Sequence, residues 1–152
     1  MKITELVNEQ RINEQLQSKT KAQVLHELAA LLEQDGKLSD RDVFLQSIHA
    51  REQQGSTGIG FGVAIPHGKS AAVIEPAIAF GRSSQGVEFD SLDGHPAKLF
   101  FMIAVPEQSD NLHLQTLAKL SRKLMHESFR DELMHAKTKG DILHVLSQMD
   151  PS

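Results

Sequence analysis

Apolar positions in the first third of the chain recur with the period of an α-helix. A helix is expected from Thr20 to Glu33, because four apolar residues form one stripe and Thr20 with Gln23 makes a capping box. A second helix is expected to start at an N-cap on Ser39 and to end near Arg51. The stripes consist of Val24, Leu25, Leu28 and Leu32 in the first helix, and of Phe44, Leu45 and Ile48 in the second. Both helices are therefore amphipathic, with one face for a core.

The middle of the chain changes to strand-like patterns. Residues 55–68 hold five glycines and a proline, which predicts a loop leading into a short strand at Val63–Ile65. Further strands are expected at Ala77–Gly81 and Leu99–Val105. Because residues 99–105 are apolar without alternation, their strand is expected at the centre of a sheet that helices cover on both faces.

Helical spacing returns after residue 106. A helix capped by Ser109 or Asp110 is expected over residues 111–125, with Leu117, Leu120 and Leu124 on its buried stripe. A weaker helical stretch follows at residues 129–136, and a last helix is expected over residues 141–149. This order of elements predicts one α/β domain over residues 1–152, built as a layered sandwich.

The composition is that of a soluble globular protein, with 39% hydrophobic and 24% charged residues. The formal net charge of -4 argues against nucleic-acid binding, which usually requires a clustered basic excess. The chain has no cysteine, so disulfides, thiolate metal sites and cysteine nucleophiles are excluded. No segment has the length and apolar character of a signal peptide or a membrane span, so we expect a cytoplasmic protein without direct membrane insertion.

The strongest chemical candidate is His67, which stands between Pro66 and Gly68. Pro66 biases Ile65 toward an extended conformation and Gly68 permits a sharp turn, so His67 is expected as an accessible side chain at the end of a strand. A neutral imidazole can attack phosphorus with one ring nitrogen while a hydrogen bond holds the other. The competing interpretation is a turn histidine without a chemical role.

Groups that suit a phosphate surround His67 in the sequence. Backbone N–H groups of the glycine run and nearby hydroxyls are expected to donate to phosphate oxygens, and two cations flank the run. These candidates are Ser56, Thr57, Gly58, Gly60, Gly62, Arg51 and Lys69. His113 is a further candidate, because it heads the inward stripe of a helix whose N-terminus favours anions. The competing interpretations are a core histidine at His113 and a solvated cation at Arg51.

Other phosphate and metal motifs are incomplete. Val63 stands where a dinucleotide fingerprint needs its third glycine and where an ATP-binding loop needs its first. No His-Glu-x-x-His helix occurs, and the scattered histidines do not have the spacing of a zinc site. We therefore expect no metal, no nucleotide and no organic cofactor.

The run from Arg51 to Lys69 resembles the phosphorylation-site signature of enzyme IIA (EIIA) domains of the fructose and mannitol type, from the bacterial sugar phosphotransferase system. The likeness covers nearly the whole chain and is greatest to the fructose branch. It continues through residues 77–82, 92–94, 100–107 and 113–121. One departure is Phe61, where the family commonly has a polar residue such as asparagine.

The resemblance implies a mixed, five-stranded sheet flanked by helices, and a phosphotransferase that works through a phosphohistidine. It matches His67 to the phosphoacceptor, and Arg51 and His113 to its partners at the phosphate site. It further implies phosphoryl transfer from the phosphocarrier HPr to a cognate enzyme IIB, which acts with a membrane enzyme IIC in sugar uptake. No metal or organic cofactor is implied.

The main hypothesis is in-line attack by His67, through Nε2, on phospho-HPr, with Arg51 and the helix end at His113 stabilising the developing charge. Ile59 and Phe61 are candidates for an apolar docking face beside the site. The first alternative is a regulatory relative that controls target proteins through its phosphorylation state. The second is a module that binds anions without covalent chemistry.

Overall fold

The computed structural model describes residues 2–150 of the chain. In that part, two short 3-10 helices precede five α-helices and six strands join in one sheet. The helices are η1 (Ile3–Glu5), η2 (Glu9–Arg11), α1 (Lys21–Gln34), α2 (Arg41–Gln53), α3 (Leu112–Leu124), α4 (Glu127–His135) and α5 (Lys139–Ser147). The strands are β1 (Ile12–Asn13), β2 (Gly58–Gly60), β3 (Val63–Ala64), β4 (His67–Ser70), β5 (Ala77–Val87) and β6 (Ala97–Pro106).

The sheet is mixed, as expected, with β6 near its centre. Its order is β1-β5-β6-β3-β2, and β4 also pairs with β6. Strands β3 and β4 run parallel to successive parts of β6, whereas β5 is antiparallel to it. Consequently β3 and β4 are two segments of one sheet position, and residues 65–66 form the link between them.

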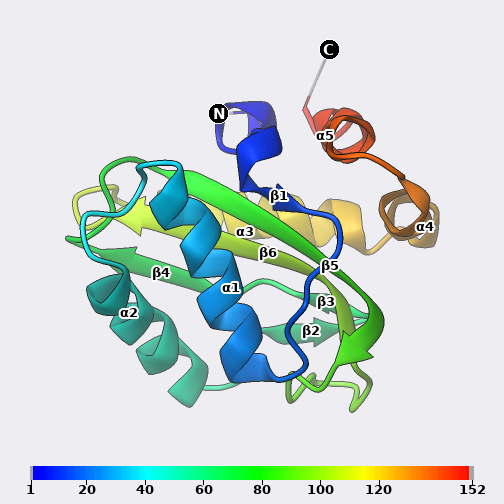
Figure 1. Ribbon diagram of the computed structural model, residues 1–152, viewed down its shortest axis with the longest axis horizontal. Helices are drawn as coiled ribbons and strands as arrows, with labels where there is room; N and C mark the ends of the chain where they lie inside the picture. Colours follow the sequence, from blue (N-terminus) through cyan, green and yellow to red (C-terminus); the bar gives the residue numbers. More distant parts are fainter. Residues whose placement is uncertain (1, 151–152) are drawn as a thin grey trace.

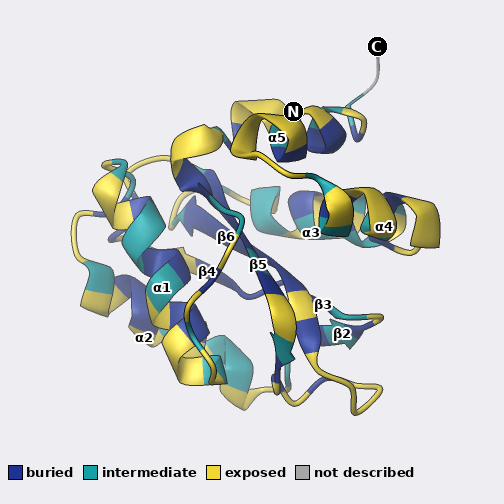
Figure 2. Cartoon of the chain, turned by 45° about the vertical axis from the view of Figure 1, so that its right-hand side comes forward, coloured by how far each residue is buried: buried dark blue, intermediate teal, exposed yellow. Residues whose placement is uncertain are grey.

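Helices cover the sheet on both faces, which confirms the predicted sandwich (Figure 1). Alternate side chains of β6 enter two separate cores: Phe100 and Met102 face α1 and α2, whereas Phe101 and Ile103 face α3 and the C-terminal helices. This explains why the strand is apolar without alternation. Figure 2 shows the buried residues gathered on the sheet and on the helix faces turned toward it.

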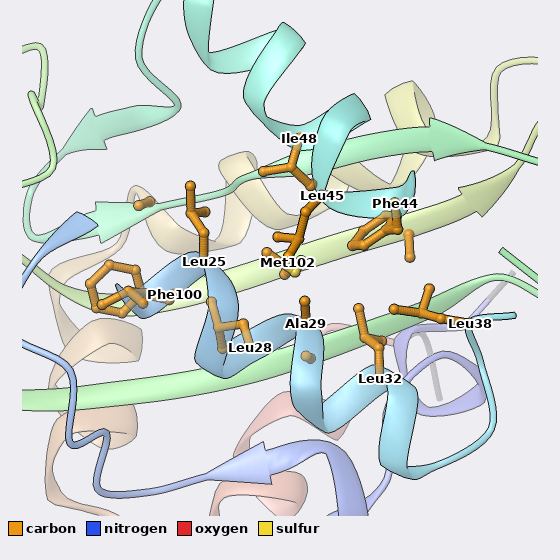
Figure 3. Packing of buried hydrophobic residues seen from close by; sticks show 14 of the residues in the cluster. Leu25, Leu28, Ala29, Leu32, Leu38, Phe44, Leu45, Ile48, Phe100 and Met102 are labelled. Atoms are coloured by element: carbon orange, nitrogen blue, oxygen red, sulfur yellow. The ribbon is translucent and has the colours of Figure 1, made fainter. Parts of the chain in front are cut away.

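The predicted stripes of α1 and α2 form the first core with Phe100 and Met102 (Figure 3). Leu28, Leu32, Phe44 and Ile48 are completely buried there. The cap on Thr20 is confirmed, since its side chain accepts the N–H of Gln23. The reciprocal half of the capping box is absent, because the Gln23 side chain accepts the N–H of Lys19 instead.

Two other predicted caps are wrong. Asp40, not Ser39, caps α2: its charged carboxylate accepts the N–H of Val43 at the positive end of the helix, and the Ser39 hydroxyl donates to the carbonyl of Ala72. Neither Ser109 nor Asp110 caps α3: the N-cap residue is Asn111, whose side chain makes no capping hydrogen bond. The hydroxyl of Ser109 lies instead against the end of β6, where it donates to the Pro106 carbonyl at 2.6 Å.

The sheet agrees with the expected mixed sheet of about five strands, since its six strands occupy five positions. Strands β1 and β4 are too short, and too mixed in polarity, to show a period in the sequence. The expected strand at residues 77–81 extends to Val87, beyond its apolar part, with an irregularity of register after Arg82. In the described part of the chain, no helix combines the length and apolarity that crossing a bilayer requires.

Candidate functional site

His67 opens β4, opposite Ile103 of β6. Pro66 lacks an N–H but its carbonyl accepts the N–H of Ile103 at 2.9 Å, so the chain rejoins the sheet immediately after the proline. The side chain of His67 is more buried than expected, with an exposed fraction of 7% for the residue. The imidazole is therefore pinned at a strand start and largely screened from solvent.

Gly68 has a different role from the expected turn, because it continues β4. A Cβ at this position would overlap the Ser47 hydroxyl and lie 3.2 Å from Ile48 and 3.3 Å from Phe44. Glycine thus lets α2 pack closely on β4, directly beside His67.

One ring nitrogen of His67 is held by its own backbone. Nδ1 lies 2.8 Å from the carbonyl oxygen of Ile65, and a carbonyl can only accept a hydrogen bond. We therefore assign the proton of the neutral ring to Nδ1. Nε2 is left with the lone pair, which makes it the nucleophilic nitrogen of the ring.

Electrostatics keep His67 neutral. Burial lowers the pKa of His67, and the positive charge of Arg51 lowers it further, whereas the hydrogen bond to Ile65 and the charge of Glu52 oppose the shift. An unprotonated imidazole is the form that can attack phosphorus.

His113 lies in the first turn of α3, and its ring faces that of His67 with 6.3 Å between centroids and an interplanar angle of 37°. Its pKa is lowered by burial first, and then by the nearness of the His67 ring and of the Lys69 ammonium. Nδ1 of His113 is buried and has no hydrogen-bond partner within residues 2–150. The predicted pair of histidines is thus brought together from segments 46 residues apart in the chain.

Arg51 occupies the last turn of α2, where it is half-buried and donates from Nη1 to the carbonyl of Gly55 at 2.8 Å. The guanidinium is near enough to His67 for its positive charge to lower the pKa of that ring. Arg51 of α2, His67 of β4 and His113 of α3 make up the candidate cluster, in which a contact of Arg51 with a phosphate stays a prediction.

Several predicted phosphate donors already have partners in the protein. The Ser56 hydroxyl donates to the Phe89 carbonyl at 2.7 Å and accepts the N–H of Gly58 at 3.0 Å. The Thr57 hydroxyl donates to the carboxylate of Glu52. Lys69 donates to the carbonyl of Asp110 at 2.9 Å. These residues therefore shape the loops around His67, and their contact with a phosphate stays a prediction.

The glycines of the run form a tight hairpin between β2 and β3. Gly60 and Gly62 have φ values of +101° and +76°, and Phe61 between them has a φ of +58°. Asparagine is tolerated in this left-handed region better than phenylalanine, so the polar residue expected at position 61 would strain the backbone less. Phe61 is 66% exposed, and the guanidinium of Arg130 stacks on its ring.

Glu52 was not among the residues predicted for the site. Its side chain is only 7% exposed and accepts hydrogen bonds from Thr57, while Lys21 lies 2.9 Å away. The sequence held one signal for Glu52. A negative charge in the last turn of a helix interacts unfavourably with the helix dipole, so a carboxylate at this position indicates a contact outside the helix. Among the described residues, no group of three or more metal-ligating side chains is present.

Residues 5–149 match the family described as phosphoenolpyruvate-dependent sugar phosphotransferase system, EIIA 2. The chain belongs to this family. EIIA domains of this family are phosphotransferases that work through a phosphohistidine, and a phosphocarrier role follows for this chain.

Two relatives carry fructose in their names. The chain is 49% identical over 99% of its length to the fructose-specific EIIABC component of Bacillus subtilis, of which it spans 24%. It is 44% identical over 86% of its length to the fructose-specific EIIA component of Haloferax volcanii, of which it spans 84%.

A solved structure points to a second branch of the family. The nitrogen regulatory protein IIA-Ntr of Neisseria meningitidis superposes with a TM-score of 0.88 at 35% identity, covering 95% of this chain and 98% of that one.

Proposed function

We propose that residues 1–152 form one EIIA domain in the cytoplasm, which accepts a phosphoryl group from phospho-HPr on Nε2 of His67. The domain then donates this group to a cognate enzyme IIB that serves a membrane enzyme IIC of the fructose type. The observation that carries the proposal is the contact of Nδ1 with the Ile65 carbonyl, because it leaves Nε2 unprotonated beside Arg51 and His113. The identity of 44–49% to fructose-specific relatives supports the choice of sugar branch.

The phosphoryl transfer needs no separate base, because the attacking nitrogen of His67 carries no proton. Nε2 of His67 attacks phosphorus in line, its lone pair forms the new P–N bond, and the P–N bond to the donor histidine breaks with its electron pair on that nitrogen. Nδ1 of His67 keeps its proton, which remains bonded to the Ile65 carbonyl. The phosphorylated ring then carries positive charge, which makes Nε2 a good leaving group for the next transfer.

Arg51 and His113 supply the charge stabilisation in this mechanism. The guanidinium of Arg51 offers a planar fork of donors that matches phosphate oxygens. His113 stands in the first turn of α3, where unpaired backbone N–H groups and the helix dipole favour an anion. Phe61 and Leu114, which are 66% and 51% exposed, offer apolar surface for a protein partner, whereas Ile59 is half-buried against the second core.

The similarity to the nitrogen regulatory protein supports the regulatory function as a second candidate, since that match covers nearly all of both chains. The two functions use the same phosphorylated histidine and differ in the acceptor. Rapid transfer from this protein to a fructose-type enzyme IIB supports the uptake function, and absence of any enzyme IIB acceptor supports regulation.

The central experiment is intact-mass measurement after incubation with enzyme I, HPr and phosphoenolpyruvate, with wild type and His67→Ala in parallel. One acid-labile phosphoryl group on the wild type alone is the expected result. The variant His113→Ala is expected to accept the group more slowly or to lose it faster. If the wild type gains no mass while the upstream proteins are active, and phosphate still binds to His67→Ala, the function is that of an anion-binding module.

A further inference from the structure

Glu52 is buried at the end of α2 and its carboxylate is fully engaged. It accepts the backbone N–H of Thr57 at 3.2 Å and the Thr57 hydroxyl, and the ammonium of Lys21 lies 2.9 Å away. Burial of a carboxylate to 7% exposure lowers the stability of the fold unless an opposite charge and hydrogen-bond donors contact it. Lys21 supplies the charge and Thr57 supplies the donors. The result is a fixed anchor for the loop that follows α2.

Lys21 is itself tied to the same region. Its ammonium lies 4.7 Å from the ring centroid of Phe89 and 3.6 Å from the carboxylate of Asp90. The carbonyl of Phe89 in turn accepts the hydroxyl of Ser56, the residue before Thr57. The loop at residues 55–57 is therefore held by α1, by α2 and by the segment after β5.

A continuous path of hydrogen bonds leads from this anchor to His67. The carbonyl of Thr57 accepts the N–H of Ile65 at 3.0 Å. The carbonyl of Ile65 accepts the Nδ1–H of His67 at 2.8 Å. Thr57 and Ile65 thus link the carboxylate of Glu52 to the imidazole of His67.

We propose that Glu52 is a positioning residue of the phosphoryl-transfer site: by holding Thr57 it fixes Ile65, whose carbonyl sets the orientation and the tautomer of His67. This role rests on the proposed function for its catalytic meaning. Its structural consequence, a defined Nδ1–H tautomer of His67, exists in the unphosphorylated protein and can be measured there.

Glu52 also acts on His67 through its charge. Its negative charge raises the pKa of His67, against the effects of burial and of Arg51. Loss of this charge in Glu52→Gln is therefore expected to lower the pKa of His67 whether or not Glu52 orients the ring. The Nδ1–H tautomer of His67 is the readout that separates a positioning role from general stabilisation.

The variants Glu52→Gln and Thr57→Val test the two ends of the anchor. In Glu52→Gln, the new side-chain amide would present its N–H₂ to the Lys21 ammonium or to the Thr57 donors, so one of these contacts must be lost. Valine has the shape of threonine but removes the hydroxyl, while the backbone N–H and carbonyl remain. The control is Glu127→Gln, which removes an exposed carboxylate at the start of α4, far from this path in the sequence.

The measurements are ¹⁵N NMR of the His67 ring with a pH titration, and the rate of phosphoryl acceptance from phospho-HPr. In Glu52→Gln we expect a lower pKa of His67, a smaller share of the Nδ1–H tautomer and acceptance slowed by about tenfold, because small misplacements of a reacting group have large kinetic effects. Thr57→Val is expected to change the tautomer in the same direction with a smaller effect on the pKa. Glu127→Gln should match the wild type.

A folded Glu52→Gln variant that keeps the wild-type tautomer of His67 overturns the positioning role, whatever its pKa. If Glu52→Gln does not fold, the tautomer in Thr57→Val decides, and an unchanged tautomer there also overturns it. A wild type that accepts no phosphoryl group overturns the proposed function instead, while the NMR result on the unphosphorylated protein still decides whether Glu52 orients His67.

Discussion

At the residue scale, the chemistry of the site depends on which nitrogen of His67 carries the proton. The backbone carbonyl of Ile65, two residues earlier, makes that choice. Burial lowers the pKa of both histidines of the site, so both rings are neutral near pH 7. A phosphoryl group on His67 would add negative charge beside His113 and would thereby raise the pKa of His113.

The lowered pKa of His67 predicts the pH dependence of phosphoryl acceptance. The protonated ring has no lone pair for attack, so the rate falls only when the pH drops through the folded-state pKa of His67, which lies below 6.5. Acceptance should therefore decrease as the pH falls from 8, with a midpoint below 6.5. A rate profile, checked against the NMR titration of His67, measures this, and a midpoint above 6.5 contradicts it.

Replacement of Arg51 with lysine is expected to slow acceptance by about tenfold, because a single ammonium cannot provide two parallel hydrogen bonds to phosphate oxygens. The charge and the local packing are kept, so the free energy of unfolding should change little. Arg41→Lys at the other end of α2 is the matched control, with a wild-type rate. Equal rates in the two variants would indicate that Arg51 is a solvated cation.

At the scale of elements, the candidate site is built around β4, which α2 contacts from one face of the sheet and α3 from the other. Each element contributes one residue of the cluster, and the close approach of α2 to β4 at Gly68 sets the distance between Arg51 and His67. The hairpin of β2 and β3 adds the anchor at Thr57 and presents Phe61 at its turn.

Gly68→Ala is expected to lower the free energy of unfolding by about 1–3 kcal/mol, because the new methyl group overlaps Ser47 and must push α2 from β4. Phosphoryl acceptance should decrease as well, since Arg51 moves with α2. Gly140→Ala in α5 is the control, and it should raise the free energy of unfolding by about 0.5–1 kcal/mol because alanine favours a helix. The atom nearest to its added Cβ is 3.8 Å away, so no overlap arises. Chemical denaturation measures both changes, and an equally stable Gly68→Ala protein would contradict the packing argument.

At the scale of the whole molecule, one sheet separates two cores, and residues near the two ends of the sequence are joined on one side of it. Asp150 accepts the N–H of Ile3 at 2.6 Å and the hydroxyl of Thr4 at 2.8 Å, and it pairs with Lys119 of α3 at 3.1 Å. In Figure 1 the first helical turns accordingly lie close to α5. Asp150 thus connects η1, the end of α5 and α3.

Asp150→Ala is expected to lower the free energy of unfolding by about 2 kcal/mol, because several donors lose a charged acceptor. Burial raises the pKa of Asp150, but hydrogen bonds from Ile3, Thr4 and Lys119 outweigh it and hold this pKa below its usual value. The contribution of Asp150 is therefore present above the pKa of the unfolded chain and is lost as the pH falls through the lower folded-state pKa. Chemical denaturation at neutral and acidic pH measures it, and Asp131→Ala, an exposed change on α4, should alter stability by less than about 0.5 kcal/mol.

Periodic segments of this chain were predictable, and short or strained ones were not. The stripes of α1, α2 and α3 and the apolar run of β6 recur over enough residues to show their period. Strands β1 and β4 have two and four residues, so no period can appear in them. The caps predicted at Ser39 and Ser109 were wrong because several side chains near each helix start could have served as caps. The hydroxyl of Ser39 bonds to Ala72, which is distant in sequence, and that of Ser109 bonds to the end of β6 at Pro106.

The sequence by itself determined the class of fold, the family and the proposed acceptor, because these depend on residue types at fixed spacing: the apolar stripes, and Pro66, His67 and Gly68 after a glycine run. The tertiary structure decided what the residues of the site do. It showed that Nδ1 of His67 bonds to the carbonyl of Ile65 and that His113, 46 positions later in the sequence, faces the His67 ring. It also showed that the Thr57 hydroxyl donates to the buried carboxylate of Glu52. Hydrogen-bond partners and burial depend on groups from distant segments, and only the folded chain brings those groups together.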